Sequence, residues 1–189
     1  MRRFIFNLVS VLFSAVKFGI MKLLHFHHFY FDGIQRFSPN TEVIIAESGT
    51  IRLGRHVRAH RRSKLLAMDG GTLEIGSNTA LGSGVSVNCM EKIVIGEGVQ
   101  IGPDTKIYDH DHDYRVPGGI GAGKFVTAPV VIGDNTWIGC NVVILRGTTI
   151  GKNCIVGAGS VLKGTYPDNS VIVQKRQTSV TVYPTGTEK

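Results

Sequence analysis

The sequence predicts an all-β fold, a parallel β-helix with a protruding loop and an N-terminal amphipathic helix. An aliphatic residue recurs at every sixth position of the C-terminal half, at Ile132, Ile138, Ile144, Ile150, Val156 and Leu162. Two positions before each stands a second small or apolar residue, and residues two apart face the same side of a strand. Glycine often follows the aliphatic residue, and we expect it to relieve backbone strain at a turn. Such a chain closes into coils of three short strands, about 18 residues each, whose stacked strands pair in parallel.

Residues 1–31 form the first predicted segment, two arginines followed by a long apolar run. Asn7, Ser10, Ser14 and Lys17 recur at helical spacing and place a polar stripe along one side of an apolar helix. The stripe disfavours a membrane span, and Lys17 within the apolar run disfavours a signal peptide. Two placements stay open. The helix either packs on the β-helix or a neighbouring subunit, or lies in the membrane interface.

Residues 32–173 make up the predicted β-helix, and residues 174–189 a C-terminal tail. Inward pairs in its first half, such as Ile51 with Leu53, follow one another at steps of six or eight, so we expect looser coils there. The register is interrupted at about 108–127, a stretch rich in glycine and charge that we expect to protrude as a loop. Part of it keeps the six-residue count and would otherwise form another coil. Loops that leave a rigid scaffold are where functional residues gather.

Composition narrows the class of protein. The chain has 189 residues, 42% of them hydrophobic, which is too apolar for a disordered chain. Its three cysteines are an odd number, which argues against a disulfide framework and for a reducing, cytoplasmic environment. The net charge of +7 includes six cations between residues 52 and 64. No nucleic-acid motif or stacking aromatic accompanies them, so we expect no nucleic-acid partner. We interpret them as solvated charge or as a contact to anionic lipid or to a lipid-diphosphate-linked glycan.

The densest repeat stretch, GDNTWIGCNVVILRGTTIGKNCIVGAGSVL, resembles the hexapeptide-repeat acyltransferases. The subgroup it resembles most contains the galactoside, maltose and nodulation-factor O-acetyltransferases and those of capsule and O-antigen synthesis. The resemblance covers roughly residues 70–172 and implies a left-handed coil, a homotrimer with grooves between subunits, and acetyl-CoA as co-substrate. It further implies an O-acetyltransferase acting on a sugar hydroxyl of a bacterial surface polysaccharide or its lipid-linked precursor. From the cysteines, the apolar helix and the basic stretch we expect the protein in the cytoplasm or on the inner face of the cell membrane.

Acyl transfer to a hydroxyl needs a base, and imidazole, which titrates near neutrality, is the natural side chain. His110 and His112 are the candidates. The resemblance places the catalytic histidine at the start of the protruding loop, which is the position of His112. A neighbouring aspartate is expected to orient the ring, and Asp111 is also a candidate substrate contact. The alternative is that residues 109–113 form a solvated loop without a catalytic role.

The resemblance also supplies binding residues. Asn88 matches a residue that hydrogen-bonds the acceptor sugar, and Glu91 is a weaker candidate for the same role. The CoA groove is expected near three residues of the C-terminal coils, Trp137, Cys140 and Ala158. Three cations are candidate contacts to the CoA phosphates, with solvated surface as the alternative, namely Lys163, Lys175 and Arg176.

Four other interpretations of the sequence differ in metal content, mechanism, acceptor or catalytic activity. Carbonic anhydrase-like members of this fold bind zinc through three histidines, and no histidine follows His112, so we expect no metal. Cys89 would permit a covalent acyl intermediate, but a cysteine without an activating base is usually an apolar filler. An N-acyltransferase acting on a nucleotide-linked amino sugar would use the same groove and base. A non-catalytic binding or scaffold β-helix would keep the repeats and tolerate loss of His112.

Overall fold

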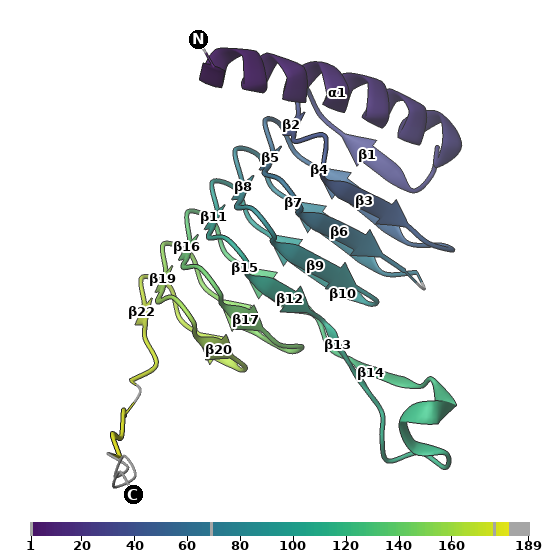
Figure 1. Ribbon diagram of the computed structural model, residues 1–189. Coiled ribbons are helices and arrows are strands. Elements are labelled where there is room, and N and C mark those ends of the chain that lie inside the picture. The colour runs from purple at the N-terminus through teal and green to yellow at the C-terminus, as the bar shows by residue number, and fades with distance from the viewer. Residues whose placement is uncertain (1, 69, 176, 182–189) are drawn as a thin grey trace, which may run out of the picture.

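A computed structural model describes residues 2–68, 70–175 and 177–181. A helix, α1 (Arg2–Leu24), lies across one end of a parallel β-solenoid, and a hairpin projects from the side of the solenoid (Figure 1). Three parallel sheets form the walls of a prism, and each turn of the chain adds one strand to each wall. This confirms the predicted all-β fold class.

In the described residues, each wall takes one strand from each successive turn of the chain. The first wall contains β1 (Phe29–Phe31), β4 (Thr50–Leu53), β7 (Thr72–Ile75), β10 (Lys92–Ile95), β15 (Val130–Ile132), β18 (Thr149–Ile150) and β21 (Thr165–Tyr166). The second wall contains β2 (Arg36–Phe37), β5 (Arg58–Ala59), β8 (Ala80–Leu81), β11 (Gln100–Ile101), β16 (Trp137–Ile138), β19 (Ile155–Val156) and β22 (Val171–Ile172). The third wall contains β3 (Glu42–Ile45), β6 (Lys64–Ala67), β9 (Ser86–Cys89), β12 (Lys106–Tyr108), β17 (Val143–Ile144) and β20 (Val161–Leu162).

The core is the stack of inward pairs that the six-residue period predicts. Every aliphatic residue of the C-terminal run is buried, and so is every residue two positions before one, namely Val130, Thr136, Val142, Thr148, Cys154 and Ser160. Coil length shrinks along the chain. Ile51 pairs with Leu73, 22 residues on, whereas Val131 pairs with Thr149, 18 residues on. The early strands are correspondingly four residues long in several places, which fits the looser N-terminal coils.

The glycines after the aliphatic residues have a different role from the one expected. None of them has a positive φ in the described residues; the left-handed conformation falls two residues later, as at Asn135 and Asn153. A Cβ on Gly133 would lie 2.6 Å from the backbone nitrogen of Lys152 on the next coil. Glycine is needed because stacked coils approach each other closely at these corners, and asparagine tolerates the left-handed position better than most residues.

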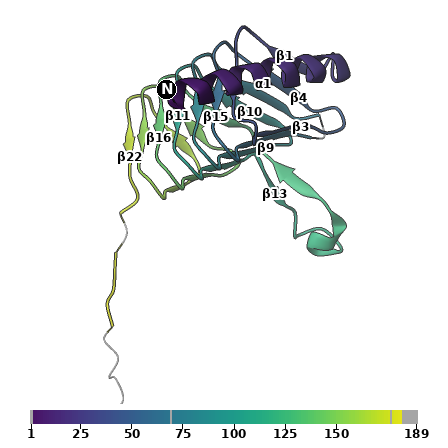
Figure 2. The ribbon, with the colours of Figure 1, turned by 45° about the horizontal axis from the view of Figure 1, so that its top comes forward.

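The interruption of the register is a hairpin rather than a further coil. Strand β13 (His110–His112) pairs antiparallel with β14 (Phe125–Thr127), and a short 3-10 helix, η1 (Gly119–Ala122), lies between them. Figure 2 shows the hairpin extending away from the prism. Ile120 in η1 is 64% exposed, so this part of the six-residue count is coincidental. The chain then returns to the first wall at β15, confirming the expected protruding loop.

Helix α1 covers the open end of the solenoid with its polar stripe. The Ser14 hydroxyl accepts a hydrogen bond from the Phe37 backbone nitrogen at 2.8 Å, and Lys17 Nζ donates to the Thr41 carbonyl at 2.8 Å. Phe18 is fully buried, with its ring 4.8 Å from that of Phe37. The first coil of an open solenoid has no coil before it to pair with its backbone groups, and the polar stripe supplies partners for two of them. The solenoid itself begins at β1, inside the segment 1–31.

Candidate active site

The root of the hairpin is held by a buried carboxylate. Asp109 is fully buried, and its two oxygens accept hydrogen bonds from the backbone nitrogens of Met90 and Glu91 at 2.9 and 2.8 Å. The same carboxylate lies 3.0 Å from Nδ1 of His110. Burial alone would raise the pKa of Asp109, but the hydrogen bonds from His110 and the two backbone groups outweigh it, so the pKa lies below its usual value. Asp109 is therefore an anion at neutral pH that fixes one nitrogen of the His110 ring.

Cys89 lies beside this carboxylate and is buried. Burial, reinforced by the charge of Asp109, raises the pKa of its thiol far above the usual value. A thiol that stays protonated at neutral pH is a poor nucleophile. The geometry therefore disfavours a covalent mechanism through Cys89 and leaves it the role of a small apolar filler.

The two histidines of β13 lie on the same face of the hairpin, since they are two residues apart in a strand. The ring of Phe125 on β14 packs between them, 5.6 Å from the His110 ring and 4.5 Å from the His112 ring. Their surroundings differ. The side chain of His110 is only 13% exposed, whereas His112 is exposed and has no hydrogen-bond partner among the described residues. His112 can reach an external substrate, and His110 is held at the root.

Asp111 points to the other face of the hairpin, between the two histidines in sequence. Its carboxylate accepts a hydrogen bond from Arg146 Nε at 2.6 Å, and the pair is partly exposed. Arg146 follows β17, the neighbour of β12 in the third wall. The ion pair ties the hairpin to the next coil, and sequence reasoning did not single out Arg146, because the two residues are 35 positions apart.

Asn88 lies on the outer face of the third wall, near the hairpin root. It stands opposite Tyr108 in the pairing of β9 with β12, and Nδ2 donates to the Ser86 hydroxyl at 3.0 Å. The Tyr108 ring lies 6.0 Å from the His110 ring, edge to face. The structure thus brings Asn88 and the histidines to one region. The Glu91 side chain is exposed, and this residue contributes to the root through its backbone nitrogen.

The residues expected near CoA gather at another corner of the prism. Trp137 is 58% exposed on the second wall, and a hollow of about 190 Å³ beside it is lined in part by His60 and Gly102. Cys140 and Ala158 are exposed at the turns that follow on successive coils, where the Cys140 carbonyl accepts from the Gly159 nitrogen. These turns present backbone groups and one aromatic ring along the stacking direction, as an extended ligand would require.

The hairpin and the corner that carries Trp137, Cys140 and Ala158 do not meet within one chain. Strands β12 and β17 run parallel, with Lys106 opposite Val143. The hairpin leaves from the carboxyl end of β12, whereas Cys140 lies just before the amino end of β17. Each lies at a different edge of the third wall. The two groups of candidate residues are therefore separated by the width of the third wall.

The candidate phosphate contacts lie at the far end of the solenoid. Lys163 and Lys175 are exposed. Arg176 lies outside the described residues. Within the described part of the chain, no group of three or more histidine, cysteine, aspartate or glutamate side chains is arranged to hold a metal ion.

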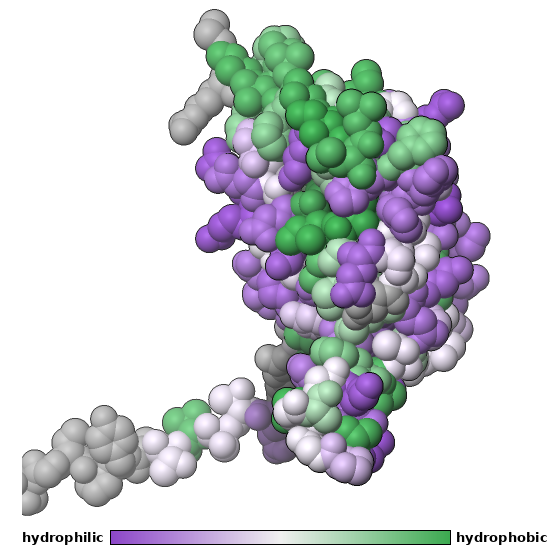
Figure 3. All heavy atoms as spheres, turned by 90° about the vertical axis from the view of Figure 1, so that its right-hand side faces the viewer, coloured by the Kyte–Doolittle hydropathy of each residue, from purple (hydrophilic) through white to green (hydrophobic). Residues whose placement is uncertain are grey.

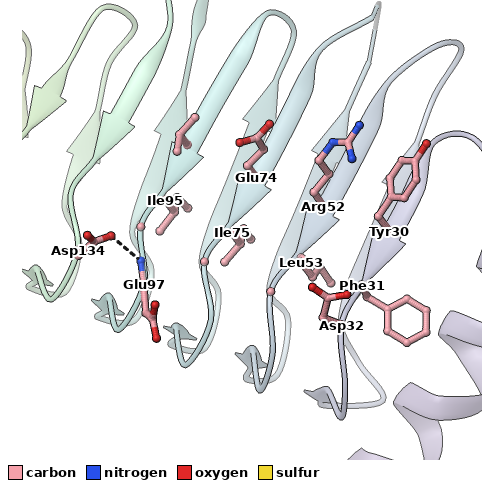
Figure 4. Close-up of a pocket in the computed structure, with 14 residues that line it drawn as sticks. Tyr30, Phe31, Asp32, Arg52, Leu53, Glu74, Ile75, Ile95, Glu97 and Asp134 are labelled. Atoms are coloured by element: carbon pink, nitrogen blue, oxygen red, sulfur yellow. Dashed lines mark hydrogen bonds between the residues drawn. The ribbon is translucent and has the colours of Figure 1, made fainter.

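A shallow groove of about 810 Å³ crosses the outer face of the first wall (Figure 4). Tyr30, Arg52 and Glu74 stand in a row on adjacent strands there, and none of the predicted site residues lines the groove. Asp134, at one end, accepts from the Glu97 nitrogen at 3.0 Å and from Lys152 at 2.8 Å. The hydrogen bond from Lys152 lowers the pKa of Asp134, which makes it a weak base. The hairpin offers better acyl-transfer chemistry than this groove.

Comparisons with known proteins agree with the fold and the repeats. The bacterial transferase hexapeptide (six repeats) family matches residues 129–164. A protein of Escherichia coli K12 named as a putative lipopolysaccharide biosynthesis O-acetyl transferase is 30% identical over 138 residues, which cover 68% of this chain and 69% of that protein. This chain belongs to the hexapeptide-repeat acyltransferase family. The family assignment confirms the resemblance that the repeat stretch indicates.

Two solved structures are similar in fold to this chain. A hexapeptide-repeat acetyltransferase of Vibrio cholerae in complex with acetyl coenzyme A is 27% identical with a TM-score of 0.58, covering 85% of this chain and 73% of that one. AntD, an N-acyltransferase of Bacillus cereus, has a TM-score of 0.65 at 22% identity, covering 84% of each chain, and this likeness concerns the fold. The chain spans 42% of the length of a Mycobacterium tuberculosis relative named as a probable acetyltransferase.

Proposed function

We propose that the protein transfers an acetyl group from acetyl-CoA to a hydroxyl of a sugar, within a bacterial surface polysaccharide or its lipid-linked precursor. Membership of the acyltransferase family supports the reaction class. The named function of the Escherichia coli relative supports a glycan hydroxyl as acceptor. The acetyl-CoA bound by the Vibrio cholerae protein supports the donor.

The observation that carries the proposal is the exposed imidazole of His112 on a hairpin whose root is fixed by Asp109. His112 removes the proton from the acceptor hydroxyl as that oxygen attacks the thioester carbonyl. Backbone N–H groups stabilise the tetrahedral oxyanion, the C–S bond breaks, and the CoA thiolate takes the proton from the imidazolium. His110 is the second candidate for the base, with Asp109 as its orienting partner.

The active assembly in this proposal is a homotrimer. One subunit contributes the hairpin, and its neighbour contributes the corner with Trp137, Cys140 and Ala158. The separation of these two half-sites on opposite edges of the third wall supports this arrangement. We also propose a cytoplasmic location, where acetyl-CoA and a reducing environment are available, and three free cysteines, one of them exposed, fit it.

Release of free CoA thiol, followed in a panel of acceptors, tests the proposal. The panel contains neutral oligosaccharides, a lipid-linked glycan and a nucleotide-linked amino sugar. The products are then treated with hydroxylamine, which cleaves O-acetyl esters and leaves amides intact. Acceptor-dependent thiol release that His112→Ala abolishes, with a hydroxylamine-labile product, supports O-acetylation. A stable amide identifies an N-acyltransferase, and no release with any acceptor contradicts both.

A further inference from the structure

Helix α1 is amphipathic, but its polar side faces the protein and its apolar side faces outward, the reverse of an ordinary surface helix. Every exposed residue between positions 4 and 24 is apolar: Phe4, Ile5, Leu8, Val9, Leu12, Ala15, Val16, Gly19, Ile20, Leu23 and Leu24. Figure 3 shows this hydrophobic surface gathered at the helix end of the molecule, above a largely hydrophilic body. Contiguous exposed apolar surface of this extent marks an interaction site.

The polar groups of α1 are turned toward the solenoid. Ser10 and Ser14 are each 1% exposed. Lys17 and Lys22 direct their ammonium groups to backbone carbonyls, those of Thr41 and Phe29. Burial lowers the pKa of Lys17, against the opposing effect of Glu42. The outward face is therefore free of charge between positions 4 and 24, and this is a consequence of how the helix packs.

The packing also decides between two ways of meeting a membrane. Phe4–Leu24 is long and apolar enough to span a bilayer, yet 22% of its most apolar stretch is buried against the solenoid. Phe18 lies among the rings of the first coil, 5.1 Å from Phe29. A spanning orientation would break these contacts and expose the serine and lysine stripe to lipid tails. A helix lying in the plane of the interface keeps all of them.

Charge distinguishes a bilayer from a second copy as the occupant of this face. The coils directly beneath α1, residues 32–64, contain seven Lys or Arg and three Asp or Glu, an excess of 7 − 3 = +4. Arg61 lies 5.1 Å from the ring of Phe6 on the helix, and Arg52 lies 4.2 Å from the ring of Tyr30. Two copies meeting face to face would bring these basic coils together. Anionic lipid headgroups would instead neutralise them.

We propose that the apolar face of α1 docks the protein on the surface of an anionic phospholipid bilayer, with the helix in the plane of the interface. The cations of the first coils then lie at headgroup level. The inference does not depend on the proposed enzymatic function, because it rests on the burial and charge of α1 and the coils beneath it.

Vesicle flotation of the full chain tests the proposal. Vesicles of phosphatidylcholine with phosphatidylglycerol should bind the parent, and Leu12→Gln with Val16→Gln should weaken binding by at least about tenfold, since two apolar contacts are lost. The matched control is Val171→Gln with Val173→Gln, two residues that are 70% and 63% exposed at the far end of the solenoid and should bind like the parent. Equal binding of the two double variants would overturn the proposal, as would equal binding of the parent to pure phosphatidylcholine.

Two further measurements distinguish the in-plane helix from a membrane-spanning helix and from contact with a second copy of the chain. Leu12→Trp, in a background in which Trp137 is replaced by phenylalanine, should be quenched most by lipids brominated near the headgroup. Strongest quenching by bromines at the bilayer centre indicates a spanning helix and overturns the in-plane arrangement. Light scattering without vesicles covers the remaining case: if Leu12→Gln with Val16→Gln lowers the oligomeric mass while the parent fails to float, the face binds a second copy and the proposal is wrong.

Discussion

Replacement of Asp109 by asparagine should destabilise the protein by about 2–4 kcal/mol, because the carboxylate is buried and accepts hydrogen bonds on both oxygens. An amide has one acceptor oxygen, so its NH2 group must face either the Glu91 nitrogen or the His110 ring, whereas the Met90 nitrogen lies within hydrogen-bond distance of both oxygens. At least one buried donor then loses its acceptor, at about 1–3 kcal/mol, and the remaining hydrogen bonds lose their charge assistance. For a chain of this size the expected fall in melting temperature is about 6–12 °C.

Thermal melting followed by circular dichroism measures this effect at pH 7. Asp113→Asn is the matched control, because Asp113 lies on the same hairpin and its carboxylate accepts from the Arg115 nitrogen at an exposed position. The control should stay within about 0.5 kcal/mol of the parent. If Asp109→Asn melts within one or two degrees of the parent, the carboxylate does not hold the hairpin root, and the reasoning fails.

The effect should depend on pH in a defined direction. Since the pKa of Asp109 is lower in the folded protein, its stabilisation is present at pH values above the unfolded pKa, about 3.9. It is lost as pH falls through the folded value. The stability difference between the parent and Asp109→Asn should therefore be constant near neutrality and shrink in acid below about pH 4.

Further substitutions test the close approach of stacked coils, the ion pair of Arg146 with Asp111, and the role of Trp137. Gly139→Ala should destabilise by about 1–3 kcal/mol, because its Cβ would lie 2.6 Å from a backbone nitrogen of the next coil, whereas Gly121→Ala, with open space around it, should be neutral in the same melting assay. Arg146→Met should lower kcat several-fold with little change in melting temperature, and Asp111→Asn should match it, since either variant breaks the exposed pair. Trp137→Ala should raise KM for acetyl-CoA about tenfold while kcat changes less, as measured by steady-state thiol release.

The walls of the prism could be predicted from the sequence because each coil repeats one burial pattern. A buried residue such as Ile144 is followed six residues later by another, and local sequence is enough to reveal that period. The reason why glycine follows the aliphatic residues could not be predicted from the sequence. The contact that excludes a side chain at Gly133 comes from the following coil, and only the three-dimensional stacking reveals it.

The sequence predicts which residue types form the candidate site, but not which groups hold them by hydrogen bonds and ion pairs. The run containing His110 and His112 stands out as an ionisable cluster where the register breaks. The partners of Asp109, however, are backbone groups 18 and 19 residues away, and Arg146 is 35 residues from Asp111. Such contacts depend on coil length, which varies along this chain.

The orientation of α1 was also beyond the sequence. A polar stripe on an apolar helix is compatible with either face pointing outward. Here the open end of the solenoid decides, because the Phe37 nitrogen and the Thr41 carbonyl need partners and the stripe supplies them.

Turnover with an accepted glycan, compared between full-length His112→Ala and His110→Ala, tests the assignment of the base most directly. The account predicts that His112→Ala lowers kcat by about 10²–10⁴-fold, the usual contribution of a general base, with the melting temperature unchanged. His110→Ala should lower stability and leave a larger share of the turnover. Full activity in His112→Ala, or a greater loss of kcat in a folded His110→Ala that Asp109→Asn reproduces, would contradict the account and assign the chemistry to the buried pair.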